Sequence, residues 1–148
     1  MRYMAIDGDK EFHERESRAW TEKGVSSIRV DSMCEGIQFA SKENFMFIVI
    51  NADNVDYKSN LGVLRSVTST PILIATFNFS IEEHVFAISS GADAYGFINS
   101  SGKYVNSVVA IVNRTKEQQK YGQQQKEKSQ NEQINQEAQI NADADIII

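Results

Sequence analysis

The apolar residues of this chain fall into short runs, separated by longer stretches in which apolar positions recur at helical spacing. The third run, residues 45–50, is apolar at every position, which is typical of a central parallel strand covered on both faces. Runs of this length, bounded by polar residues, are expected to be strands. We expect five of them, at residues 3–6, 25–30, 45–50, 72–75 and 94–98.

The stretches between and after the runs predict helices within 9–24, 33–42, 61–67, 81–91 and 103–114. Ser32 and Ser80 stand where an N-cap is needed, and Gly24 and Gly91 stand where a helix would end. Strands that alternate with helices along the chain favour a parallel sheet with helices on both faces. The expected fold class is therefore α/β, a doubly wound, flavodoxin-like sheet of five parallel strands with five helices.

The apolar residues become sparse after about residue 114, so we expect a folded domain at 1–116. Residues 117–148 are rich in Gln, Glu, Lys and Asn and have little to bury, which is typical of a flexible linker. The final DIII resembles the start of another strand, so we expect the chain to be cut before an output domain.

The formal charge of −5 argues against DNA binding by this chain alone, because such binding depends on Lys and Arg neutralising phosphates. A single Cys34 forms no internal disulfide, and no long apolar span is present. We expect a cytoplasmic protein without membrane contact, with Cys34 a buried or half-buried side chain. His13 and His84 lack partners at ligand spacing, so they are expected to be surface or boundary residues rather than metal ligands.

Polar residues follow the expected strands, and in a doubly wound sheet these ends share the carboxyl edge, where ligands bind. The segments that carry them read AIDGDKEF, TPILIAT and SGADAYGFINS. In this order and spacing, they resemble the receiver domains of bacterial response regulators over residues 1–114. The resemblance implies an acidic pair that holds magnesium, an Asp that accepts a phosphoryl group, a hydroxyl residue that reaches toward that group, and a Lys.

Transferred to this chain, the acidic pair becomes Asp7 and Gly8, with Asp9 next to them. The phosphoryl acceptor falls on Asn51, or on Ala52 if the register shifts by one residue.

The hydroxyl residue matches Thr76, whereas the Lys position holds Ile98, followed by Asn99. An amide is a poor nucleophile, one carboxylate binds magnesium weakly, and without the Lys the phosphoryl charge has no counter-ion. We therefore expect a non-enzymatic, phosphorylation-independent domain without a cofactor, in which Asp7 and Asp9 bind magnesium weakly at most.

The polar residues that follow the expected strands are called the polar corner: Asp7, Asp9, Asn51, Asp53 and Thr76. Two alternatives stay open for their function. Asp53 or Asp56 would be a displaced phosphoryl acceptor, with Asp9 as a metal ligand, although the Lys would still be missing. The DGD after the first strand also resembles the nucleophile motif of haloacid-dehalogenase-type phosphatases, but the downstream Lys and acidic pair of that class have no counterpart at a strand end.

The layout of domain and linker resembles the winged-helix (OmpR/PhoB-type) transcriptional regulators. This implies that the chain acts on transcription, that it touches DNA only through a C-terminal domain, and that it forms a homodimer through its fourth helix, fifth strand and fifth helix. Residues expected on that face are Val85, Phe86, Tyr95, Tyr104 and Val108. The alternative is a stand-alone protein-interaction module.

The resemblance also implies a switch in which Thr76 moves together with Tyr95, an aromatic residue of the fifth strand. Phe77 stands where the family usually has a small residue. We expect Phe77 to fill the vacated pocket and to fix one state of the switch.

Overall fold

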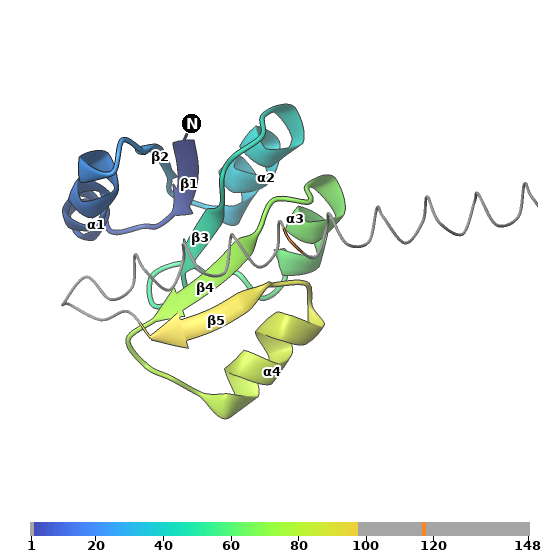
Figure 1. The fold of residues 1–148 in the computed structure, drawn as a ribbon. Helices are drawn as coiled ribbons and strands as arrows, with labels where there is room; N and C mark the ends of the chain where they lie inside the picture. The colour runs from blue at the N-terminus through green and yellow to red at the C-terminus, as the bar shows by residue number, and fades with distance from the viewer. Residues whose placement is uncertain (1, 98–116, 118–148) are drawn as a thin grey trace, which may run out of the picture. The chain divides into compact units, whose positions relative to one another are not determined.

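The computed structural model describes residues 2–97 and 117, and the helix expected at 103–114 lies outside them. The described residues contain strands and helices in strict alternation (Figure 1). Their bounds are β1 (Arg2–Ile6), α1 (Lys10–Glu22), β2 (Ser26–Val30), α2 (Met33–Lys42), β3 (Ile48–Asn51), α3 (Leu61–Val67), β4 (Ile72–Thr76), α4 (Ile81–Ser89) and β5 (Ala94–Phe97).

The five strands form one sheet in the order β2-β1-β3-β4-β5, and every neighbouring pair is parallel. This is the flavodoxin-like order, and it confirms the predicted fold class. The strand order reverses between β1 and β3, where Ile6 pairs with Ile50. The residues that follow this pair, Asp7 and Asn51, therefore lie next to each other at the carboxyl edge of the sheet.

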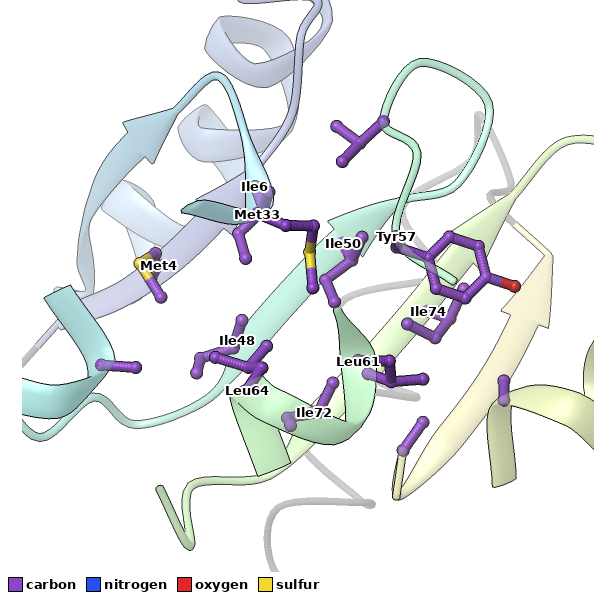
Figure 2. Close-up of a cluster of buried hydrophobic side chains, with 14 of the residues drawn as sticks. Met4, Ile6, Met33, Ile48, Ile50, Tyr57, Leu61, Leu64, Ile72 and Ile74 are labelled. Carbon is purple, nitrogen blue, oxygen red and sulfur yellow. The ribbon is translucent and has the colours of Figure 1, made fainter. Parts of the chain in front are cut away.

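The sheet is apolar on both faces. Alternate residues of β1 belong to two separate clusters, Met4 and Ile6 to one and Tyr3 and Ala5 to the other. The first cluster packs β1, β3 and β4 against α2 and α3 (Figure 2). The third strand begins at Ile48 and not at residue 45 as expected, because the apolar run also contains residues that only pack against the core: Phe45 and Phe47 are buried, and Met46 is half-buried.

The expected helix ends are confirmed. The Ser32 hydroxyl accepts a hydrogen bond from the Glu35 amide at 3.3 Å, and the Ser80 hydroxyl accepts one from the Glu83 amide at 3.3 Å. Gly91 follows α4 with φ +115°, a conformation that favours glycine. These local contacts set where the helices begin and end.

Helix α2 lies very close to β1 at Gly36. A Cβ atom on Gly36 would stand 2.4 Å from Cδ1 of Ile6, a side chain with no exposed surface. Glycine is therefore required for this close approach of helix and strand.

Arg65 of α3 joins three segments at the amino edge of the sheet. Its Nη2 donates to the carbonyls of Thr68 and Thr70, each at 2.7 Å. Its Nη1 donates to the Gly91 carbonyl at 3.1 Å and to the Asp93 carboxylate at 3.0 Å. A planar guanidinium can serve four acceptors in this arrangement, and an ammonium group cannot.

On the face covered by α1, the rings of Tyr3 and Phe47 are stacked 4.6 Å apart, and Trp20 of α1 packs against both. His13 is also buried here, with Nε2 3.2 Å from the Ser27 hydroxyl. The prediction that His13 is a surface or boundary residue is therefore wrong, because its position in α1 faces the sheet.

Beside His13 lies a pocket of about 20 Å³ that reaches Asp7 and Asn51 and has room for one water molecule. Burial lowers the pKa of His13 below its ordinary 6.5, and burial raises the pKa of Glu16, which also lines the pocket. Both shifts favour the uncharged form of the side chain.

Replacing Arg65 by Lys should lower the free energy of unfolding by about 1–3 kcal/mol, because half-buried carbonyls lose charge-assisted partners. Urea unfolding monitored by circular dichroism would measure it. Arg18→Lys on the exposed side of α1 is the matched control and should have little effect. Equal unfolding midpoints for both variants would contradict the role assigned to Arg65.

His13 should make stability depend on pH. Because its folded pKa lies below its unfolded value, its contribution is present above about pH 6.5 and is lost as the pH falls toward the folded pKa. The unfolding free energy should therefore decline between about pH 7 and pH 5 more steeply in the wild type than in His13→Gln. Ser27→Ala, which keeps the imidazole, should retain the steep decline; identical slopes in the wild type and His13→Gln would refute this assignment.

Candidate functional site

The carboxyl end of β1 places Asp7 at the polar corner, where only 4% of its surface is exposed. Its Oδ1 accepts a hydrogen bond from the Asp9 amide at 2.8 Å. The next residue, Gly8, donates its amide proton to the Asn54 side chain at 2.9 Å. The Asp9 carboxylate in turn accepts from the Phe12 amide at 3.0 Å and caps α1. The backbone amides after β1 therefore find hydrogen-bond acceptors in nearby side chains of the chain itself.

Asn51 is the last residue of β3, and its side chain is directed at Asp7. Its Nδ2 donates to Asp7 Oδ2 at 3.3 Å, and its Oδ1 accepts from the Asp53 amide at 3.1 Å. Ala52 instead packs against the cluster under α2 and α3. At this strand end, Asn51 and not Ala52 is therefore the residue that contacts Asp7.

These residues do not fit a magnesium ion well. Hard cations take several oxygen ligands, and here one carboxylate, that of Asp7, is already bonded through both oxygens to Asn51 and Asp9. The next residue, Gly8, has no side chain to offer a ligand, and the Asp9 carboxylate is occupied as a helix cap. Within the described part of the chain, no group of three or more His, Cys, Asp or Glu residues could hold a metal ion.

At the end of β4, Thr76 is almost fully buried and donates its hydroxyl proton to Asp53 Oδ1 at 2.7 Å. The Phe77 amide donates to the other carboxylate oxygen, also at 2.7 Å. The Thr76 oxygen accepts a further bond from the Asn78 amide at 2.9 Å. Asp53 therefore joins the loop after β3 to the loop after β4.

Phe77 does not fill the pocket as expected. Its side chain is 47% exposed, and its ring meets the ring of Phe12 edge-on at 5.5 Å. The expectation failed because the residue after a strand end leaves the alternation of the strand. The polar groups of Thr76 and Phe77 face the Asp53 carboxylate instead.

Tyr95 of β5 is buried, and its hydroxyl accepts from the Ser80 amide at 3.1 Å. Its ring stacks on His84 at 5.3 Å and also contacts Phe79. Burial raises its pKa, and the nearby Glu83 carboxylate raises it further. With 7% of its surface exposed, Tyr95 presents little area to a partner, unlike the dimer-face role expected from the sequence.

Four large apolar side chains of α4 are exposed. Among them are two residues expected on the dimer face, Val85, which is 61% exposed, and Phe86, which is 38% exposed. Ile81 and Ile88, which the sequence did not mark as candidates, are also exposed and lie one turn away on each side of Val85. The remaining candidates lie outside the described residues: Ile98, Tyr104 and Val108.

One further contact of this region involves α4. Lys58, in the loop after β3, forms an ion pair with Glu83 of α4 at 2.9 Å. In the sequence, only the opposite charges of Lys58 and Glu83 indicate this ion pair. The alternative acceptor Asp56 lies in the same loop and is exposed.

Cys34 is exposed, which contradicts the expected burial, because it lies on the outer side of α2.

Neither a protein-family model nor a curated protein matches the sequence. Within the described residues, no helix has the length and apolar character needed to cross a membrane. Solved structures do match, and those compared below are 16–22% identical to this chain.

A CheY-like receiver domain protein from Methanospirillum hungatei superposes with a TM-score of 0.71 at 16% identity, over 79% of this chain and 97% of that one. A two-component response regulator from Clostridium difficile gives 0.68 at 22% identity, over 77% and 96%. HP1043, an orphan response regulator of H. pylori, gives 0.67 at 20% identity, over 76% and 96%. The chain therefore has the fold of the receiver domains of response regulators.

Proposed function

We propose that this chain is a receiver-type regulatory domain that signals without being phosphorylated. The observation that carries the proposal is the hydrogen bond between the Asn51 amide and the Asp7 carboxylate, at the place where a phosphoryl acceptor would stand. An amide does not form an acyl phosphate, because its nitrogen lone pair is delocalised and no carboxylate oxygen is available.

Two more positions support a function without phosphorylation. Gly8 replaces the second acid, so that a magnesium ion would find only one nearby carboxylate that is not a helix cap. Ile98 replaces the Lys expected to neutralise the phosphoryl group. The domain therefore binds no cofactor and is not an enzyme in this proposal.

The output of the domain is proposed to be transcriptional, through a DNA-binding domain of a longer protein. The net charge of −5 supports a division of labour in which another domain contacts the DNA. The domain is proposed to act as a homodimer through a face that includes the exposed apolar residues of α4. Apolar side chains that lie one turn apart on an exposed helix favour contact with a partner.

Phosphorylation at Asp53 or Asp56 is the competing function. Asp53 is exposed, but both of its carboxylate oxygens already accept hydrogen bonds. Asp56 is exposed in the loop after β3 and does not stand at a strand end. Neither carboxylate has a Lys at the position that the family uses.

The first prediction from this proposal concerns phosphoryl mimics. Amide NMR spectra of residues 1–148 should not change when magnesium and then beryllium fluoride are added, because no acceptor carboxylate binds them at Asn51. The amides of Asp7, Asp9, Asp53 and Thr76 report on the corner.

Asn51→Asp is the matched control for this experiment. It places a second carboxylate beside Asp7, so magnesium should now shift the amides around Asp7. Large changes in the wild type at modest beryllium fluoride concentration would mean that a working acceptor survives, and the proposal would fail.

The second prediction concerns the face on α4. Val85→Glu should convert a dimer into a monomer, because a charge in an apolar contact must be desolvated. Sedimentation velocity would measure the change. Val63→Glu is the matched control: Val63 is an exposed valine of α3, and its replacement should leave the dimer intact. A wild-type chain that remains monomeric at high concentration, or a Val85→Glu variant that remains dimeric, would refute this face.

A further inference from the structure

The carboxylate of Asp53 is held by two donors that belong to the end of a neighbouring strand. The Thr76 hydroxyl binds Oδ1 and the Phe77 amide binds Oδ2, each at 2.7 Å. One donor for each oxygen is a geometry by which proteins bind anions, and hydrogen bonds to a charged acceptor are stronger than those between neutral groups.

The pairing of β3 with β4 places Asp53 close to the end of β4. Strands β3 and β4 are neighbours, with Asn51 paired to Ala75, so the loops that follow them begin side by side. The backbone of Asp53 is fixed in addition, because its amide donates to the Asn51 side chain at 3.1 Å. Asn51 thus orients the turn that brings the Asp53 carboxylate to Thr76.

We propose that the Thr76 hydroxyl and the Phe77 amide form an anion site, and that Asp53 fills this site from within the chain. The inference rests on the proposed function, since it names the group that holds the two donors when no phosphoryl group forms. The ligand class of the site is a small oxyanion, represented here by a carboxylate of the same chain.

The filled site fixes the segment that leads into α4. With its proton directed at Asp53, the Thr76 oxygen is free to accept the Asn78 amide at 2.9 Å. Two residues further on, the Ser80 amide donates to the buried Tyr95 hydroxyl. Lys58 adds a second tie from the loop after β3, through its ion pair with Glu83. An internal anion therefore holds α4 and its exposed apolar surface in one arrangement.

The simpler explanation is an ordinary contact between two loops, since Asp53 is exposed to solvent. The two explanations differ in one respect. A loop contact is lost when Asp53 is removed, whereas an anion site, once emptied, accepts another oxyanion. Inorganic phosphate can therefore distinguish them.

The experiment compares amide NMR spectra of the wild type, Asp53→Ala and Asp56→Ala, without magnesium, during titration with sodium phosphate at constant ionic strength. Asp56→Ala removes the same charge from the same loop and controls for net charge. Asp53→Asn is a fourth protein that keeps the size of the side chain and an acceptor oxygen, in case the alanine variant does not fold.

In Asp53→Ala the Phe77 amide proton should move upfield and exchange faster with solvent, because it has lost a carboxylate acceptor. Phosphate should then shift the Thr76 and Phe77 amides back toward their wild-type positions. Asp53→Asn should show a smaller upfield change, and phosphate should leave the wild type and Asp56→Ala unchanged at these two amides.

Three results would overturn the proposal: a Phe77 amide that does not respond to Asp53→Ala or to Asp53→Asn, no effect of phosphate on the emptied site, or an equal effect of phosphate on the wild type. None of these results concerns magnesium or beryllium fluoride. If they occur while the wild type ignores beryllium fluoride, the internal anion is refuted and the proposed function stands. If the wild type responds to beryllium fluoride, the proposed function fails whatever Asp53 does.

Discussion

Parallel pairing of β1 with β3 is the constraint on which the polar corner depends. The chain leaves both strands at the same edge of the sheet, so Asp7 and Asn51 are brought together although they are distant in sequence. Both side chains are nearly inaccessible to solvent, and buried polar groups need partners. Two carboxylates in this place would repel each other and require a cation, whereas a carboxylate and an amide satisfy each other.

The uncharged amide of Asn51 connects two segments at this edge of the sheet. Asn51 uses its nitrogen for Asp7 and its oxygen for the Asp53 backbone, so a single side chain connects the end of β1 to the loop after β3. That loop then reaches the end of β4 through Asp53. Three strand ends are therefore joined by atoms of the chain itself, which is how the corner can be stable without an external charge.

Much of the fold could be predicted because its signals are local. Ser80 and Gly91 mark the two ends of α4 in the sequence, and the alternation of strand and helix determines the parallel sheet. The presence of Asp7, Asn51 and Thr76 at one edge also followed from that topology. The pairing of Asp53 with Thr76 could not be predicted, because the path of a loop depends on contacts made after the strands have assembled. The exposure of Phe77 was missed because Phe77 follows the end of β4, where the alternation of the strand no longer determines which way a side chain points.

Gly36 of α2, which has no side chain, has a consequence for Asp7 at the end of β1. Helix α2 reaches Ile6 at this point, and Ile6 is the covalent neighbour of Asp7. Any larger residue at position 36 would have to displace Ile6 or push the helix away, because the packed core offers little room. The residues that α2 can accept are therefore restricted by the position of Ile6, and through Ile6 by the geometry of the Asp7 carboxylate.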